Sequence, residues 1–129
     1  MKHIAICENH LYSKAYQKGA KFVCEHFVAY VLKDFKATKL MKANPQKEYV
    51  NRVGLTVSKK IGGAVSRNRA KRILREGLRL AEQDNNFKKG YLIVLVARAG
   101  IVTAKSSEIK KEVERAMRAL HMINNEENT

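Results

Sequence analysis

Residues 59–79 read KKIGGAVSRNRAKRILREGLR, and the rest of the chain is organised around this stretch. From about Arg67 onward, apolar residues recur at spacings of three, four, seven and eight. They are Ala70, Ile73, Leu74, Leu78 and Ala81. Residues at these spacings share one face of an α-helix, because a helix has about 3.6 residues per turn. The pattern therefore predicts a helix that begins near Arg67 and buries one face.

The same stretch carries half of the chain's net positive charge. It holds eight Lys or Arg and a single acid, Glu76, so +7 of the formal net charge of +14 lies in 21 of 129 residues. At about 100° per residue, the polar side chains project away from the apolar face. We call this set the cationic stripe: Asn68, Arg72, Arg75 and Arg79, with Arg69 and Lys71 on its flanks. Such a charge density predicts that the stripe binds a polyanion.

The residues before this helix predict how it begins. Ser66 can accept a hydrogen bond from a free amide of the first turn and is predicted as the N-cap, with Val65 packing on Ala70 as a hydrophobic staple. Gly62 and Gly63 allow a tight turn and a close approach of backbone amides to an anion such as phosphate. No G-x-x-x-x-G-K-[ST] sequence occurs, so the glycine pair does not indicate a nucleoside triphosphate site.

Length and composition predict one domain, residues 1–129, that attracts a polyanion. A chain of 129 residues, 45% of them hydrophobic, can bury one core. The 26 Lys and Arg exceed the 12 Asp and Glu, so nucleic acid and an anionic membrane surface are the candidate partners. No apolar run reaches the roughly 18 to 20 residues that span a bilayer, and the first residues, MKHIAICENH, lack a signal-peptide core. We therefore expect a cytoplasmic protein.

Cysteine and histidine do not indicate a metal or catalytic centre. Cys7 and Cys24 stand 17 positions apart without a CxxC pair, which is typical of two free thiols. The histidines are scattered, at His3, His10, His26 and His121. A Ser/His/Asp or Cys/His arrangement would have to form in space from distant residues, and nothing in the pattern indicates one. We predict no catalytic residues and no metal ligands.

The chain before the central stretch predicts a helix, a strand and a loop. Asn9 can cap a helix that runs to about Lys18, where Gly19 can end it. Residues 21–32 are rich in Phe, Val and Tyr, which predicts a strand with apolar side chains on both faces. One face carries Phe27, Ala29 and Val31, and the other carries His26, Val28, Tyr30 and Leu32. Residues 33–51 are polar and Lys-rich, contain Pro45 and predict an exposed, mobile loop.

The strands on either side of the central helix differ in pattern. Residues 52–59 alternate, with Val53, Leu55 and Val57 facing one way, so one side of this strand packs and the other stays open. Residues 91–97 form a nearly unbroken apolar run, which is typical of a buried central strand.

The C-terminal part of the chain completes the predicted fold. Ser106 or Ser107 starts a last helix, and the polar residues 124–129 are expected to fray. Its apolar residues recur at helical spacing, at Ile109, Val113, Ala116, Met117 and Leu120. The order helix, strand, strand, helix, strand, helix predicts a single-domain α/β (α+β) two-layer sandwich in which the helices leave one sheet face partly open.

Residues 53–76, VGLTVSKKIGGAVSRNRAKRILRE, resemble the signature of the bacterial ribonuclease P protein component. The resemblance rests on the strand, the Ser-Lys-Lys at its end, the glycine turn, the central Arg-Asn-Arg at 67–69 and the spacing of the basic residues after it. It extends more loosely over residues 9–120. It implies the same sandwich, with a left-handed crossover between two parallel strands, although ordinary crossovers are right-handed.

The resemblance also implies a function. A member of this family binds a large catalytic RNA and the 5′ leader of precursor tRNA, and assists the Mg²⁺-dependent endonucleolytic removal of that leader. In this family the RNA holds the catalytic Mg²⁺ ions and carries the chemistry. The dispersed acids of this chain agree with that division, because protein nucleases with two metal ions need clustered carboxylates. Neither a membrane nor a protein partner is expected.

The resemblance assigns two sets of residues to RNA. The set for the catalytic RNA is Lys59, Lys60, Arg67, Asn68, Arg69, Lys71, Arg72 and Arg75. The set for the leader is Tyr12, Tyr16 and Tyr30, which align with aromatic residues of the family's leader cleft, together with Thr56, Ser58 and Arg98 on the border of the open sheet face. Phe27 projects to the other face and is expected in the core.

Three positions depart from the family pattern. Gly63 stands where Asn is usual, Leu78 replaces a common Phe, and the loop before Tyr49 is long. The first departure removes a side chain that can hydrogen-bond, whereas the other two are variations of packing and surface.

Two other functions fit the charge pattern. One is a ribosomal or other structural RNA-binding protein with a basic helix. The other is a DNA-binding protein whose helix enters a major groove, but such helices usually have a helix-turn-helix partner or a zipper. Here the neighbouring elements are strands.

Overall fold

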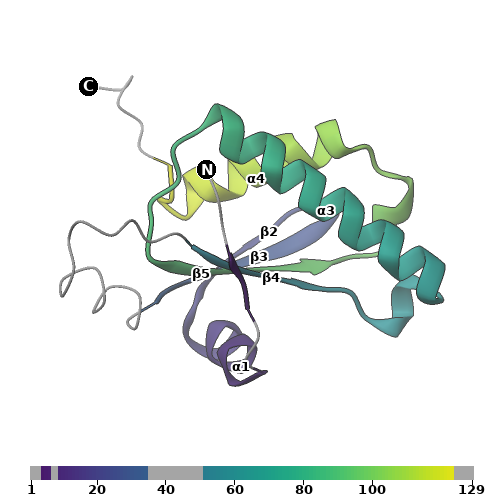
Figure 1. Ribbon diagram of the computed structural model, residues 1–129, viewed down its shortest axis with the longest axis horizontal. Coiled ribbons are helices and arrows are strands. Elements are labelled where there is room, and N and C mark those ends of the chain that lie inside the picture. Colours follow the sequence, from purple (N-terminus) through teal and green to yellow (C-terminus); the bar gives the residue numbers. More distant parts are fainter. Residues whose placement is uncertain (1–3, 7–8, 35–50, 124–129) are drawn as a thin grey trace.

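A five-stranded sheet forms the middle of the molecule (Figure 1), a computed structural model that describes residues 4–6, 9–34 and 51–123. The strand order is β1-β4-β5-β3-β2. The strands are β1 (Ile4–Ala5), β2 (Ala20–Val23), β3 (Phe27–Lys33), β4 (Arg52–Thr56) and β5 (Tyr91–Ala97). β4 runs parallel to β1 and β5, whereas β3 runs antiparallel to β5 and β2. The prediction that residues 91–97 form the central strand is confirmed.

The α-helices of the described residues cover the two faces of the sheet unequally. Helices α3 (Ala64–Asp84) and α4 (Ser106–Ala119) lie side by side on one face, and the shorter α1 (Asn9–Lys18) lies on the other (Figure 1). This arrangement confirms the predicted α+β sandwich with one partly open face. Helix α3 also links β4 to its parallel neighbour β5. The left hand that the resemblance gives this crossover stays a prediction.

The strands alternate their side chains between two apolar clusters. Phe27, Ile93 and Leu95 point to the larger cluster beneath α3 and α4, whereas Leu92 and Val94 point to a smaller one beneath α1. Because successive strand residues face opposite ways, β5 needs apolar residues at nearly every position. Phe27 is fully buried, which confirms its expected place in the core.

Helix α3 buries the predicted face. Ala70, Leu74, Leu78 and Ala81 are at most 1% exposed. At Gly77, a Cβ would come within 2.5 Å of the Ile109 side chain on α4, so a glycine is required for this close approach of the two helices. Packing of this kind fixes the opposite, polar face of α3 toward solvent.

The residues predicted as one strand, 21–32, form two strands joined by a tight turn. β2 ends at Val23, β3 begins at Phe27, and the Cys24 amide donates to the Phe27 carbonyl over 2.8 Å. The prediction failed because strand-forming residues occupy both sides of the turn and the turn itself contains neither glycine nor proline. Strand β1 was also not predicted.

The ends of the predicted loop 33–51 are not exposed loop. Lys33 belongs to β3, and Asp34 and Asn51 are buried. Arg52 Nε donates to Asp34 over 2.6 Å, and the Asn51 side chain donates to the Lys88 carbonyl and accepts from the Tyr91 amide. Polar groups can be buried there because they are hydrogen-bonded. Residues 35–50, and the tail 124–129 predicted to fray, lie outside the described residues.

Helix α3 begins earlier than predicted. Its first residue is Ala64 and its N-cap is Gly63, whose carbonyl accepts from the Arg67 amide over 3.0 Å. Ser66 therefore lies within the first turn, and Val65 is 85% exposed and does not form the predicted staple. The preceding strand is correspondingly shorter, because β4 ends at Thr56 and residues Lys59–Ile61 form a short 3-10 helix, η1.

The two glycines before α3 have different roles. Gly62 has φ 143° and ψ −161°, a conformation essentially restricted to glycine. Gly63 has φ −75° and ψ −173°, which any residue can adopt, and a Cβ added there meets nothing within 4 Å. Only the first glycine is required by the turn.

We predict that Gly63→Asn stabilises the protein, because an asparagine at the N-cap can accept a hydrogen bond from a first-turn amide of α3. Together with the lower entropy of the unfolded chain, the cap should add about 0.5 to 1 kcal/mol to the free energy of unfolding in urea. Gly63→Ala is the matched control, since it restricts the unfolded chain but offers no acceptor. Equal stability of the two variants would contradict the capping role.

Candidate nucleic-acid interface

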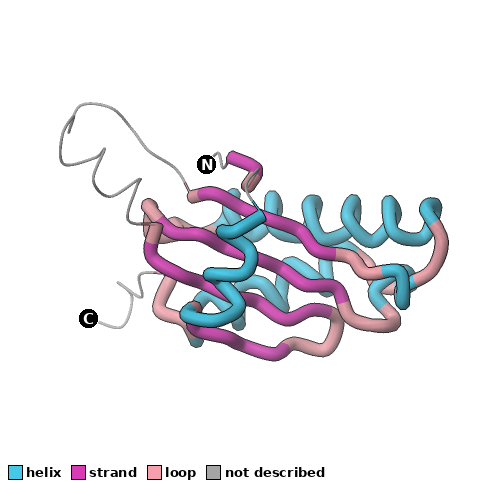
Figure 2. Tube along the Cα trace, turned by 90° about the horizontal axis from the view of Figure 1, so that it is seen from below, coloured by secondary structure: helices cyan, strands magenta, loops and turns pink. Residues whose placement is uncertain are grey.

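Members of both predicted sets of RNA-binding residues lie at one end of the sheet. β4 and β5 are parallel, so their C-terminal ends lie at the same end of the sheet, and α3 begins at this end (Figure 1). Ser58, Lys59 and Lys60 follow β4, and Arg98 follows β5. Helix α1 crosses only part of the opposite face, so the strand ends stay uncovered (Figure 2).

The cationic stripe lies on the exposed face of α3, as predicted. Asn68, Arg69, Arg72 and Arg75 are exposed, and so are Lys59 and Lys60 just before the helix, whereas Arg67 and Lys71 are half-buried. Within the described part of the chain, no carboxylate lies within ion-pair distance of Arg72 or Arg75. These two guanidinium groups are therefore available to an external anion.

Two other arginines of α3 are engaged within the protein. Arg79 donates to Glu76 at 2.6 and 2.9 Å, and its hydrogen bond lowers the pKa of that carboxyl. Arg69 Nε donates to the Val102 carbonyl over 3.0 Å, which joins α3 to a second 3-10 helix, η2 (Ile101–Thr103). Arg69 therefore has a structural contact in addition to any contact with RNA.

Arg67 lies at the start of α3 in a different environment. Its Nε is buried and has no hydrogen-bond partner among the described residues. A buried donor without a partner costs about 1 to 3 kcal/mol. Because it is buried, Nε itself is out of reach of an external anion in this conformation.

Two of the three predicted tyrosines form an aromatic pair above the open sheet face. The ring centroids of Tyr16 on α1 and Tyr30 on β3 are 5.0 Å apart, with their planes at 68°. The Tyr16 and Thr56 hydroxyls hydrogen-bond over 3.0 Å, which ties the pair to β4. Tyr16 is still 40% exposed, so the pair presents ring surface to solvent.

Tyr12 lies one helical turn before Tyr16, above Gly54 of β4. A Cβ at Gly54 would come within 2.5 to 2.6 Å of the Tyr12 ring, so the ring rests directly on the glycine backbone. Sequence analysis did not identify Gly54 as part of the site. A glycine inside a strand pattern is the available signal, because it often marks a close approach to the backbone.

A hollow at the edge of β4 connects Tyr12 to the stripe. Its volume is about 180 Å³. We call it the β4-edge hollow, and it is lined by Ile6, Tyr12, Val53, Leu55, Lys71, Arg75 and Leu78. The structure therefore places Tyr12 with the residues predicted for the catalytic RNA, and Tyr16 and Tyr30 together on the sheet face.

Arg98 is exposed and extends the open face beyond the aromatic pair. Val96 lies beside Thr56 on one side and Val28 on the other, and Arg98 follows two positions later on the same side of the sheet. Its Nη1 donates to the Cys24 carbonyl over 2.7 Å. Ser58, also exposed, accepts the Ile61 amide at its carbonyl over 3.1 Å as η1 begins.

The described residues hold no evident catalytic group. No three of their His, Cys, Asp or Glu side chains lie close enough to share a metal ion. Burial and then the charge of Glu112 raise the pKa of the Cys24 thiol to about 11, so this thiol is protonated at neutral pH and is not a nucleophile. Cys7 lies outside the described residues. The arrangement can bind anions and stack bases.

Within the described residues, none of the helices has the length and apolar character needed to cross a bilayer.

The sequence matches known proteins along most of its length. A family model described as Ribonuclease P matches residues 1–121. The ribonuclease P protein component of Clostridium beijerinckii is 36% identical over 128 residues, which cover 95% of this chain and 92% of that protein. That of Dehalococcoides mccartyi is 51% identical over 75 residues, and this match spans 58% of this chain and only 59% of the relative's length.

Solved structures share the fold. The RNase P protein of Staphylococcus aureus aligns with a TM-score of 0.69 and 25% identity, covering 95% of this chain and all of that chain (100%). The RNase P protein of Thermotoga maritima aligns with a TM-score of 0.61 at 22% identity, which supports the fold alone. Since the family model covers residues 1–121 and the Clostridium relative covers nearly the whole chain, this chain belongs to the ribonuclease P protein family.

Proposed function

We propose that this chain acts in the cytoplasm as the protein subunit of ribonuclease P. It binds the catalytic RNA and the 5′ leader of precursor tRNA, and it assists the Mg²⁺-dependent hydrolysis that releases the leader and leaves the mature tRNA 5′ end. The observation that carries the proposal is the β4-edge hollow, where Lys71 and Arg75 of α3 line the same space as Tyr12 of α1, beside the sheet face that carries the Tyr16–Tyr30 pair. Family membership supports the same reading.

The α3 face is suited to phosphate contacts. Arg72 and Arg75 are exposed one turn apart, with Asn68 one turn before Arg72. A guanidinium group can donate two parallel hydrogen bonds to phosphate oxygens, and each neutralised phosphate releases counterions. Arg67, half-buried at the start of the helix, adds a further positive charge. We assign this face to the catalytic RNA.

The open sheet face is suited to a single strand. Bases without a pairing partner can stack on exposed rings, at about 1 to 3 kcal/mol per base and with little sequence preference. The hydrogen bond to Thr56 holds the Tyr16 ring in place before the strand binds, which lowers the entropy lost on binding. Tolerance of sequence is useful here, because the enzyme must process tRNA precursors with different leaders.

Several acids among the described residues pair with cations of this chain, which supports the assignment of the chemistry to the RNA. Asp34 contacts Arg52, Glu76 contacts Arg79 and Glu112 contacts His26. Mg²⁺ bound by the RNA would supply the activated water and the charge stabilisation for phosphodiester hydrolysis. The residues of this chain neutralise phosphates beside that centre and hold the leader.

The proposal is tested by reconstitution with a bacterial ribonuclease P RNA. The protein should restore cleavage of precursor tRNA at a low Mg²⁺ concentration at which the RNA alone is nearly inactive, because its cations reduce the repulsion between the two RNAs. RNA-free protein should not cleave the same substrate. Failure to restore cleavage would contradict the proposal, and Mg²⁺-dependent cleavage by the protein alone would show that it carries chemistry of its own.

Replacing Arg72 and Arg75 by Gln should flatten the salt dependence of binding to the catalytic RNA. Each lost phosphate contact removes roughly 0.7 to 0.9 from the slope of log K against log salt, so the double variant should lose about 1.4 to 1.8. Arg79→Gln is the matched control, because Arg79 lies on the same helix but is paired with Glu76. A slope that the double variant leaves unchanged would remove this face from the interface.

Tyr16→Ala should weaken binding of precursor tRNA by the reconstituted enzyme by about 1 to 3 kcal/mol, with little effect on mature tRNA, because only the precursor carries a leader. Tyr16→Phe keeps the ring and removes only the hydroxyl that contacts Thr56, so its effect should be smaller. Both dissociation constants are measured for each variant. Equal losses for precursor and mature tRNA would assign Tyr16 to the fold or the RNA interface.

A further inference from the structure

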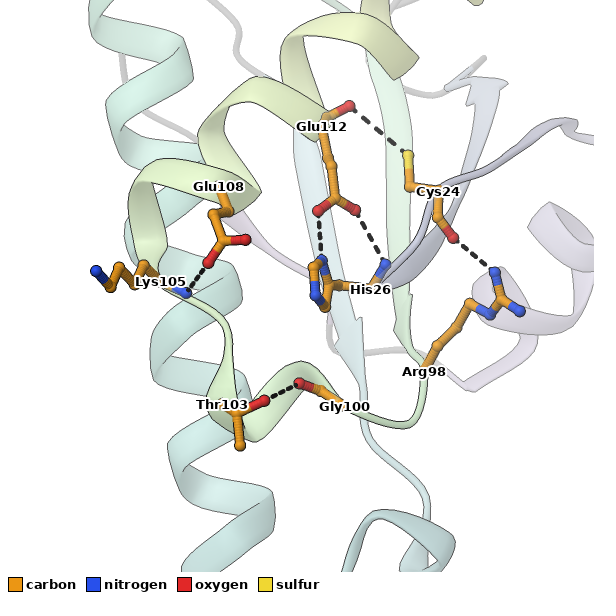
Figure 3. Close-up of polar contacts among 8 residues, drawn as sticks. All are labelled: Cys24, His26, Arg98, Gly100, Thr103, Lys105, Glu108 and Glu112. Atoms are coloured by element: carbon orange, nitrogen blue, oxygen red, sulfur yellow. Dashed lines mark hydrogen bonds and ion pairs between the residues drawn. The ribbon is translucent and has the colours of Figure 1, made fainter.

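A buried polar cluster lies behind Arg98, where the turn between β2 and β3 meets α4 (Figure 3). Glu112 of α4 is only 7% exposed. Its carboxylate accepts from the His26 amide over 3.0 Å and contacts His26 Nδ1 with its other oxygen. The Cys24 thiol donates to the Glu112 carbonyl with the sulfur 3.7 Å from the oxygen. One residue of α4 thus holds both sides of the turn.

The turn depends on this support because its own conformation is unfavourable for a hairpin. With Cys24 bonded to Phe27, only Glu25 and His26 connect the strands. Two-residue hairpins favour turns with positive φ, which match the twist of the strands. Among the described residues, His121 is the only one other than glycine with positive φ. Contacts from outside the hairpin must therefore help to keep the turn in place.

Arg98 is attached to the same turn at two points. Its amide donates to the His26 carbonyl over 2.9 Å, and its Nη1 donates to the Cys24 carbonyl over 2.7 Å. In a closed hairpin, the Cys24 carbonyl would be the acceptor for the amide three residues later. Here the guanidinium takes that acceptor, so the position of the turn determines where the guanidinium points.

We propose that Glu112 is a positioning residue for Arg98 in leader binding. By holding the Cys24–His26 turn, it aims the Arg98 guanidinium at the open end of the sheet face, where the backbone of a single strand stacked on Tyr16 and Tyr30 would pass. A fixed guanidinium loses less side-chain entropy when it contacts a phosphate. The inference rests on the proposed function, because it presupposes that the leader lies on this face.

The test is a double-mutant cycle in the reconstituted holoenzyme. Dissociation constants for precursor and mature tRNA are measured for Glu112→Gln, Arg98→Gln and the double variant. Each single change should weaken precursor binding about two- to tenfold and leave mature tRNA binding unchanged. The double variant should be no weaker than Arg98→Gln alone, because Glu112 acts through Arg98.

Two further variants separate positioning from loss of fold or charge. His26→Ala removes one of the two contacts of the Glu112 carboxylate and should give a smaller loss of precursor binding that also disappears in the Arg98→Gln background. If Glu112→Gln fails to fold, His26→Ala replaces it in the double-mutant cycle. Glu108→Gln is the charge control, since Glu108 lies on the same helix but accepts only from the Lys105 amide over 3.0 Å, away from the turn. It should not change the ratio of the two affinities.

The outcomes also separate this inference from the proposed function. Additive losses in the cycle, or equal losses for precursor and mature tRNA, would overturn the positioning role. If Arg98→Gln has no effect while Tyr16→Ala weakens precursor binding, the proposal that the leader binds this face is kept. The proposed positioning role of Glu112 is then wrong. If neither Arg98→Gln nor Tyr16→Ala affects precursor binding, the leader proposal itself is wrong.

Discussion

The fold depends on the burial of one sheet on both of its faces. β5 provides the centre, with Ile93 and Leu95 under α3 and α4 and with Leu92 and Val94 under α1. A shift of register by one residue would exchange these two sets of side chains. Each set would then face the helices on the wrong side of the sheet. Because α1 has only 10 residues, it covers just part of its face. The open surface beside it is a direct result of this unequal cover.

Charged side chains in different parts of the molecule differ in whether they have partners. Carboxylates that face the core or the helix interface have partners, as with Glu112 and His26 or Asp84 and Lys110. On the exposed α3 face, Arg72 and Arg75 have no carboxylate partner among the described residues, whereas Arg79 is paired with Glu76. Half of the net charge of +14 lies in residues 59–79, and salt will screen its exposed part more than it would screen a buried pair.

Periodicity predicted the parts of the fold whose conformation is decided locally. The buried face of α3, the central strand at 91–97 and the helix from Ser106 all follow from the spacing of apolar residues. The turn at Cys24–His26 carries no such signal, because its support comes from Glu112, 86 positions away from His26. The start of α3 was misplaced for a related reason. Ser66 is a good capping residue, but the backbone of Gly62 turns the chain earlier. The contact of Tyr16 with Thr56, 40 positions apart, likewise exists only in three dimensions.

The contact between Tyr12 and Gly54 joins two positions that are far apart in the chain. Since a Cβ at position 54 would overlap the ring at position 12, a side chain at position 54 requires the Tyr12 ring to move aside or a smaller residue to replace it. In related sequences, a side chain at position 54 should be accompanied by a smaller residue at position 12, or by a displaced first helix. Substitutions in the strand at position 54 and in the helix at position 12 should therefore be correlated.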